Sequence, residues 1–283
     1  MRLLASAGLI ALALAPAPVE LSVQSRTLGP GELVVLSIAF AEPAEPLHVH
    51  AFNREVPAFR DGDGTWRALI GVDLDVRPGT YPVTVTAGAV HASYDLIVKP
   101  RTFRTRRLTV NEAFVTPPPG ERARIQEEAA LLAGVWHSPS GERLWTGAFV
   151  RPVPGLANSA FGTRSVYNGK PRTPHGGADF LSPAGTPVHA PNAGRIAVAR
   201  ALYFTGNTVI IDHGLGLFSM LAHLSVIDAR EGDVVSAGTV VGQVGATGRV
   251  TGPHLHWAVR ANDARIDPLS LLALLGAPDP RPQ

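Results

Sequence analysis

The chain has 283 residues, of which 45% are apolar and 17% charged, as expected of a folded protein and not of a disordered one. Its 25 basic and 23 acidic residues leave a formal net charge of +2, which is too small to indicate a nucleic-acid partner. The chain has no cysteine, so disulfides and thiolate metal ligands are excluded. Any bound metal must therefore be held by His, Asp or Glu.

Residues 1–17 have the pattern of a secretory signal peptide. Arg2 supplies a positive charge, an apolar run at 3–14 is too short to span a bilayer, and small residues follow up to Ala17. An uncleaved anchor or a buried first strand is the alternative interpretation. No later segment reaches 18 consecutive apolar residues. We therefore expect an exported protein without a membrane span in its mature part.

Residues 18–100 predict a small β-sandwich-like domain. Short apolar segments alternate with turn signals such as Asp61-Gly62-Asp63-Gly64 and Arg77-Pro78-Gly79. Strands at this spacing, with no helical pattern between them, favour a sandwich. The expected strands lie at 34–40, 69–72, 81–86 and 94–98.

Residues 101–148 predict a linker with a helix. The arginine-rich stretch at 101–107 is interpreted as a solvated linker and not as a binding patch. The helix is expected at 121–134, because it follows a proline, has Glu121 in its first turn and ends near Gly134. We expect it to pack between the two domains through one apolar face, formed by Ile125, Ala129, Leu132 and Ala133.

Residues 149–276 again predict short strands, here separated by glycine-rich turns, and a tail follows at 277–283. The expected strands lie at 208–212, 217–221, 239–244 and 254–259, with one or two helical turns at 269–275. The fold class is therefore mostly β: a C-terminal sheet domain preceded by the sandwich and a short linker helix.

Two pairs of polar residues in this C-terminal part have the spacing of metal ligands. His175 and Asp179 are separated by Gly176 and Gly177, which let the backbone bend so that both side chains reach one ion. By itself this spacing is weak evidence. Residues two apart on a strand point to the same face, so the pair in His254-Leu255-His256-Trp257 would enter one pocket while Leu255 and Trp257 face a core.

The remaining histidines differ in context. His223 ends an apolar segment, where no structural role accounts for a histidine. His48-Val49-His50 shows the same alternation as the later pair, but has no ligand-like neighbour, and we interpret it as a solvent-facing strand edge. The same structural interpretation applies to His91, His137 and His189.

Taken in order, these patterns resemble the lysostaphin-type zinc metallopeptidases, the M23 or LytM-domain family. The likeness runs from about Phe161 to Leu272. It is carried by the segments His175-Gly176-Gly177-Ala178-Asp179-Phe180, Pro183-Ala184-Gly185-Thr186-Pro187-Val188, Gly206-Asn207-Thr208-Val209-Ile210-Ile211-Asp212-His213-Gly214, His223-Leu224-Ser225, Gly232-Asp233-Val234-Val235, Gly242-Gln243-Val244-Gly245-Ala246-Thr247-Gly248 and Thr251-Gly252-Pro253-His254-Leu255-His256.

The resemblance implies an antiparallel β domain with a groove and one zinc ion, Zn2+, held by His175, Asp179 and His256. It assigns His223 and His254 to catalysis. Our hypothesis is that His254 accepts the proton of a water molecule, while His223 stabilises the oxyanion or helps to pass a proton to the leaving amine. The division of labour between the two histidines is left open at this point.

Two positions qualify the resemblance. Leu221 stands where many relatives carry Tyr, which removes a possible polar neighbour of the substrate but no metal ligand. His213 matches a family position without a ligand role, and we interpret it as structural.

The expected function is that of an exported zinc metalloendopeptidase that hydrolyses peptide bonds in peptidoglycan stems or cross-bridges. The periplasm is the expected compartment, with the extracellular space as the alternative. The partners would be peptidoglycan peptides, with no nucleic acid.

Three alternatives are weighed against this function. A non-catalytic LytM-type regulator of cell-wall hydrolases is disfavoured because all five site residues are present. A biotinyl or lipoyl carrier hairpin at 231–238 lacks an acceptor lysine, since Lys99 and Lys170 lie far away in the sequence. Finally, the N-terminal sandwich could bind the wall or shield the groove.

Overall fold

The computed structural model describes residues 19–40, 46–110, 112, 115–157 and 161–277. The expected signal peptide at 1–17 and nearly all of the expected tail at 277–283 lie outside these residues. Among the helices of the described residues, none is long and apolar enough to cross a membrane. The structure is mostly β, as predicted from the sequence.

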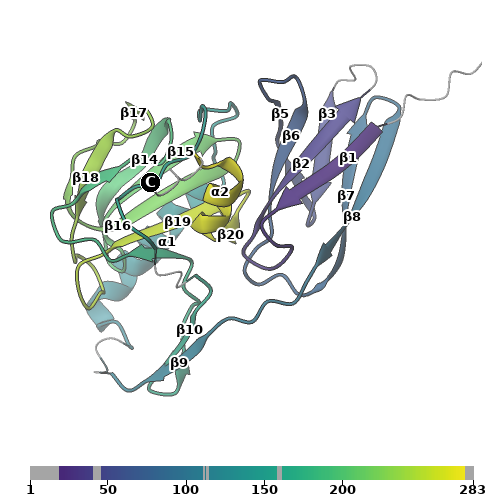
Figure 1. Cartoon of the computed structure of the whole chain (residues 1–283). Helices are drawn as coiled ribbons and strands as arrows, with labels where there is room; N and C mark the ends of the chain where they lie inside the picture. Colours follow the sequence, from purple (N-terminus) through teal and green to yellow (C-terminus); the bar gives the residue numbers. More distant parts are fainter. Residues whose placement is uncertain (1–18, 41–45, 111, 113–114, 158–160, 278–283) are drawn as a thin grey trace, which may run out of the picture.

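The N-terminal strands form two four-stranded antiparallel sheets that pack as a sandwich (Figure 1). One sheet has the order β1 (Val19–Ser25), β2 (Leu33–Phe40), β6 (Trp66–Gly71) and β5 (Ala58–Arg60), and the other has the order β4 (Arg54–Val56), β3 (Leu47–Ala51), β7 (Gly79–Ala87) and β8 (Val90–Val98). Strand β2 is buried on both faces. Val34, Leu36 and Ile38 enter the sandwich core, whereas Leu33 and Val35 enter the core of the C-terminal part.

The C-terminal part is built on a nine-stranded sheet whose strand pairs are all antiparallel. Strands β12, β19, β16, β15, β14 and β17 lie side by side in this order, β18 pairs with β13 and β16, and β20 pairs with β19. The bounds are β12 (Gly177–Phe180), β13 (Pro187–His189), β14 (Gly194–Leu202), β15 (Gly206–Gly214), β16 (Leu217–Ile227), β17 (Val234–Val235), β18 (Val240–Val244), β19 (Leu255–Ala261) and β20 (Ala264–Ile266).

Helix α1 (Arg122–Trp136) packs on the outer face of this sheet, where Leu132, Val135 and Trp136 contact the side chains of Val198, Ile210 and Phe218. The expected position between the domains is therefore wrong. The expected face is also wrong in part, because Ala129 and Ala133 are exposed. The larger side chains Val135 and Trp136 bury more apolar surface than these alanines, and they decide which face turns inward.

Helix α2 (Pro268–Leu275) follows β20, and its N-cap residue is Asp267, whose carboxylate accepts a hydrogen bond from the backbone N–H of Leu269. The segment that joins the sandwich to α1 contains β9 (Thr105–Leu108). This strand pairs in parallel with β10 (Arg164–Tyr167), which in turn pairs with β11 (Lys170–Pro171). The linker is thus fixed to the chain that leads into β12.

The sandwich packs against the turn between β19 and β20 and against α2 (Figure 1). Arg265 forms an ion pair with Asp73 at 2.6 Å. Arg54 donates to the carbonyl of Asn262, whose side-chain amide donates to the carbonyl of Leu69 at 2.9 Å. Together with the shared apolar core, these contacts join the two parts at the end of β19 that lies away from His256.

Candidate metal centre and catalytic histidines

Three adjacent strands place the candidate site. In the antiparallel register, Asp179 of β12 lies opposite His256 of β19, and His256 lies opposite Ala222 of β16. Leu255 and Trp257 are fully buried on the other side of β19. The alternation predicted for this strand is therefore confirmed, and it turns His256 toward Asp179.

His175, Asp179 and His256 form a triangle of potential metal ligands. The Nε2 atom of His175 lies 3.0 Å from Oδ1 of Asp179 and 3.0 Å from Nδ1 of His256. The third side, from His256 Nδ1 to Asp179 Oδ1, measures 2.9 Å. Between 13% and 26% of each side chain is exposed, so an ion can reach the triangle from solvent.

The chemistry of the triangle fits a cation. If both imidazoles donate to the shared Asp179 oxygen, no hydrogen lies between His175 and His256, although their nitrogens are in contact at 3.0 Å. A cation between the three atoms removes this conflict. Tetrahedral zinc with bonds of about 2.0–2.1 Å places its ligand atoms about 3.3 Å apart, which is close to the sides of the triangle.

The electrostatics also favour a cation. Burial opposes the ionisation of Asp179, but hydrogen bonds from His175 and His256 outweigh it and hold the pKa of this carboxyl below its usual range. Burial lowers the pKa of His256, which keeps this imidazole neutral, as a metal ligand must be. The ionised Asp179 beside the neutral ring of His256 is thus a partly buried negative site.

His223 and His254 lie beside the triangle. Their ring centroids are 4.9 Å apart, and Nε2 of His254 is 3.9 Å from Oδ1 of Asp179. The Nδ1 atom of His223 contacts the carbonyl of Thr247 at 3.0 Å, and Nδ1 of His254 contacts the carbonyl of Gly252 at 2.9 Å. A carbonyl can only accept, so both Nδ1 atoms carry the hydrogen and both Nε2 atoms keep a lone pair when the rings are neutral.

His223 adopts an unusual backbone conformation. Its φ angle is +68°, in the left-handed region, and the register of β15 with β16 shifts nearby. Leu221, Ala222 and Leu224 are all fully buried, so a regular strand would not turn His223 alone toward the site. The irregular backbone re-aims this one side chain, as β-bulges beside active sites commonly do. Burial lowers the pKa of His223 to about 4.

The structure brings all five residues singled out in the sequence into one cluster. The metal and catalytic roles assigned to them stay predictions. His48, which served as a contrast, is exposed and contacts Glu55 at 2.7 Å. Thr247 was missed: its carbonyl fixes the ring of His223, and its hydroxyl donates to the carbonyl of Leu224. No sequence signal marks a residue that acts through its backbone carbonyl.

Comparison with known proteins places this geometry in a family. The sequence model of Peptidase family M23 matches residues 173–268, which contain all five site residues. A peptidase M23 from Pseudomonas aeruginosa, known from its crystal structure, is 33% identical and has a TM-score of 0.71. The match covers 87% of this chain and 96% of that chain. The chain belongs to peptidase family M23.

Other M23 relatives match a shorter part of the chain. The DD-carboxypeptidase/endopeptidase Mpg of Neisseria meningitidis is 43% identical over 97 residues, which are 34% of this chain and 22% of Mpg. The peptidoglycan DD-endopeptidase ShyA of Vibrio cholerae is 45% identical over 84 residues, which are 30% of this chain and 20% of ShyA. The chain thus spans about a fifth of the length of these two relatives.

Proposed function

We propose that this M23 peptidase is a zinc endopeptidase that hydrolyses peptide bonds in the stems or cross-bridges of peptidoglycan. The observation that carries the proposal is the triangle of His175, Asp179 and His256, with the two further histidines His223 and His254 beside it. The names of Mpg and ShyA support an endopeptidase activity, and that of ShyA supports peptidoglycan as the substrate.

His175, Asp179 and His256 would hold the metal, which leaves one tetrahedral position for substrate or water. When bound, zinc supplies Lewis acidity that polarises a carbonyl group and acidifies water. The chain itself supplies the two Nε2 lone pairs that can accept protons, and the backbone carbonyls of Thr247 and Gly252 orient both rings.

The two histidines are proposed to have different tasks. His254 is the proton acceptor, because its Nε2 lies 3.9 Å from Asp179, beside the position where a water molecule would react. Burial lowers the pKa of His223 to about 4, so its ring is neutral near pH 7 and must accept a proton on Nε2 before it can pass one on. That proton is the one that His254 takes from the water, and the low pKa of His223 favours its onward transfer to the leaving amine. The neutral ring has no hydrogen on Nε2 and therefore cannot donate one to an oxyanion.

Export to the periplasm is part of the proposal. Its support is the signal-like pattern at 1–17, together with the location of peptidoglycan outside the cytoplasm. The extracellular space is the alternative compartment.

The function can be tested on purified peptidoglycan and defined muropeptides. We expect the zinc-loaded protein to release peptide fragments that mass spectrometry assigns to cleaved stems or cross-bridges. A chelator should stop the release, and added zinc should restore it. Release that persists in the chelator would refute metal dependence. A zinc-loaded protein that binds peptidoglycan but releases nothing would instead indicate the non-catalytic regulator.

A further inference from the structure

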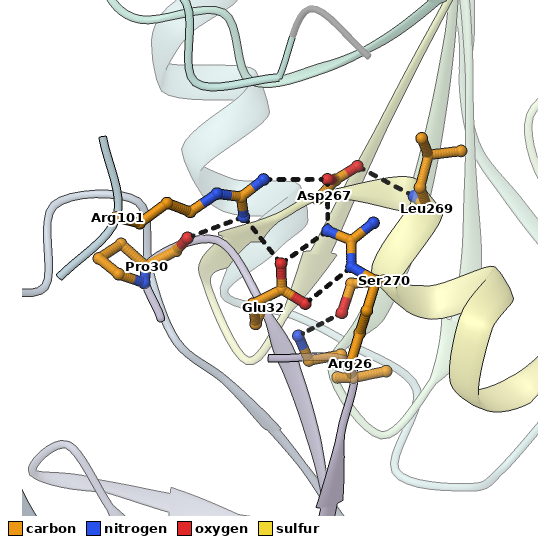
Figure 2. Close-up of polar contacts among 8 residues, drawn as sticks. Arg26, Pro30, Glu32, Arg101, Asp267, Leu269 and Ser270 are labelled. Atoms are coloured by element: carbon orange, nitrogen blue, oxygen red, sulfur yellow. Dashed lines mark hydrogen bonds and ion pairs between the residues drawn. The ribbon is translucent and has the colours of Figure 1, made fainter. Parts of the chain in front are cut away.

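Four charged side chains meet where the sandwich joins the C-terminal part (Figure 2). Glu32 and Asp267 are 1% and 0% exposed, respectively. Arg26 contacts both carboxylates, at 2.6 and 2.7 Å. Arg101 also contacts both, at 2.8 and 3.4 Å, and donates to the carbonyl of Pro30. Because buried carboxylates require paired cations, this cluster fixes both arginine side chains.

Arg101 differs from Arg26 because it also lies over two aromatic rings. Its guanidinium carbon is 5.0 Å from the ring centroid of Phe103 and 5.8 Å from that of Phe161. The two rings meet at 6.3 Å with an interplanar angle of 65°. Among the described residues, no comparable ring contact is found for Arg26. Arg101 therefore connects the ion cluster to this aromatic pair.

The two aromatic rings pack directly against the backbone of two glycines, Gly31 and Gly162. A Cβ atom on Gly31 would collide with the ring of Phe161, and one on Gly162 would collide with the ring of Phe103. Both glycines also have positive φ angles, of 83° and 76°. The rings consequently fix the backbone of Gly162, since no side chain separates the two.

That backbone holds His175. The N–H of Gly162 donates to the carbonyl of His175 at 2.7 Å, and the N–H of His175 donates to the carbonyl of Thr163 at 3.0 Å. His175 precedes β12 by two residues, so the ladder that aligns Asp179 with His256 does not include it. Its position rests on the segment that contains Gly162 and Thr163.

Among the residues that the structure describes, the ring of His175 has no polar partner outside the triangle. Its Nδ1 atom is buried, and within the described part of the chain no group pairs with it. Metal-binding histidines normally donate this second N–H to an outer partner, which orients the ring. For His175, the backbone pairing with Gly162 and Thr163 has to provide that orientation.

We propose that Arg101 is a positioning residue for the metal site: it fixes Phe103 and Phe161, and through Gly162 it sets the position of the metal ligand His175. The proposal rests on the metal site put forward above. According to this proposal, the contacts between the sandwich and the C-terminal part help to determine the affinity for zinc, although the sandwich lies away from the metal site.

The test is the zinc affinity of the untagged full-length protein, measured by competition with a chromogenic chelator. We expect Arg101→Met to raise the zinc dissociation constant roughly tenfold, at the lower end of what loss of an outer partner costs a metal site. Arg101→Lys should weaken binding similarly, because an ammonium lacks the planar group that stacks on rings and bridges two carboxylates. Arg26→Met is the matched control, and it should change the constant less than twofold.

Thermal unfolding of the metal-free proteins accompanies these titrations, and Arg101→Met and Arg26→Met should lose similar stability. If Arg101→Met does not fold, Phe103→Leu replaces it, since this change leaves the ion cluster intact and should show the same tenfold loss. Wild-type affinity in Arg101→Met or Phe103→Leu would overturn the proposal, as would an equal loss in Arg26→Met. A wild type without zinc would refute the metal site itself, which is a different result.

Discussion

At the scale of single residues, His213 forms a chain of hydrogen bonds through the core of the C-terminal part. Trp257 donates to the hydroxyl of Ser219 at 3.1 Å, and that hydroxyl lies 3.0 Å from Nε2 of His213. The Nδ1 atom of His213 lies 2.8 Å from the carbonyl of Ala193, so Nδ1 donates and Nε2 accepts. A neutral ring satisfies every partner, whereas a protonated ring would not. Burial lowers the pKa of His213 to about 4.

This low pKa predicts a loss of stability in acid. The unfolded chain takes up a proton on this histidine near pH 6.5, but the folded chain does so only near pH 4, so the unfolded state is favoured as the pH falls between these values. At pH 4 we expect the contribution of His213 to have reduced the free energy of unfolding by about 3 kcal/mol. This reduction in the free energy of unfolding is measured by urea unfolding at pH values from 7.5 to 4, in the presence of a chelator.

His213→Gln provides the control, because the amide keeps a donor and an acceptor but does not titrate. The variant should lose less stability than the wild type over this range. Equal pH dependence in the two proteins would show that His213 does not titrate as described.

Local spacing and strand alternation singled out His175, Asp179, His254 and His256, and the resemblance to family M23 joined His223 to them. It could not predict the left-handed φ of His223, since the bulge arises where β16 meets its neighbouring strands. The role of Arg101 was missed for a related reason. Its partners Glu32, Phe161 and Asp267 lie far from it in the sequence, and it was interpreted as part of a solvated linker.

At the scale of secondary structure, the close approach of β12 to β19 depends on Gly177. A Cβ atom there would lie 2.5 Å from the carbonyl oxygen of Trp257 and 2.7 Å from the ring of His256. Both distances are too short, so any side chain would push β12 away from β19. Gly176 differs, because a Cβ at that position meets nothing within 4 Å.

Gly177→Ala should therefore weaken zinc binding by roughly tenfold or more, because it displaces the ring of His256. Gly176→Ala should leave the affinity within twofold of the wild type. Both zinc dissociation constants are measured by the same competition with a chromogenic chelator. Similar affinities for the two variants would contradict the tight packing of β12 on β19.

Eight of the twenty strands of the described residues were predicted, because each of them contains a local apolar pattern between turn residues. Strand β9 was not predicted, because its apolar pattern is weak. It forms through parallel pairing with β10, which lies nearly sixty residues later in the sequence. The position of α1 was predicted wrongly for a similar reason. Nothing local in its sequence specifies that it packs against Val198, Ile210 and Phe218.

At the scale of the whole molecule, the sandwich and the C-terminal part share an apolar core. Leu33, Val35 and Leu69 of the sandwich belong to the same buried cluster as Val259 and Leu271. The contacts lie at the end of β19 away from the metal triangle. This arrangement gives no support to the hypothesis that the sandwich shields the site.

Gly71 lies at the closest point of this joint. A Cβ atom on it would be 2.6 Å from both the carbonyl oxygen of Ala261 and the side chain of Ala264. Gly71→Ala should reduce the free energy of unfolding by about 1–3 kcal/mol, the usual cost of overpacking. Gly62→Ala is the control, because its Cβ meets nothing within 4 Å. Urea unfolding of the metal-free proteins gives both values, and a fully stable Gly71→Ala variant would show that the joint is loose.

The most direct test of the proposed site is the zinc content of five alanine variants, measured by elemental analysis beside the release of peptides from peptidoglycan. All five should fail to release peptides. Variants of His175, Asp179 and His256 should also contain no zinc, whereas variants of His223 and His254 should keep one ion per chain. Zinc retained after loss of a proposed ligand, or lost with His223 or His254, would contradict the account.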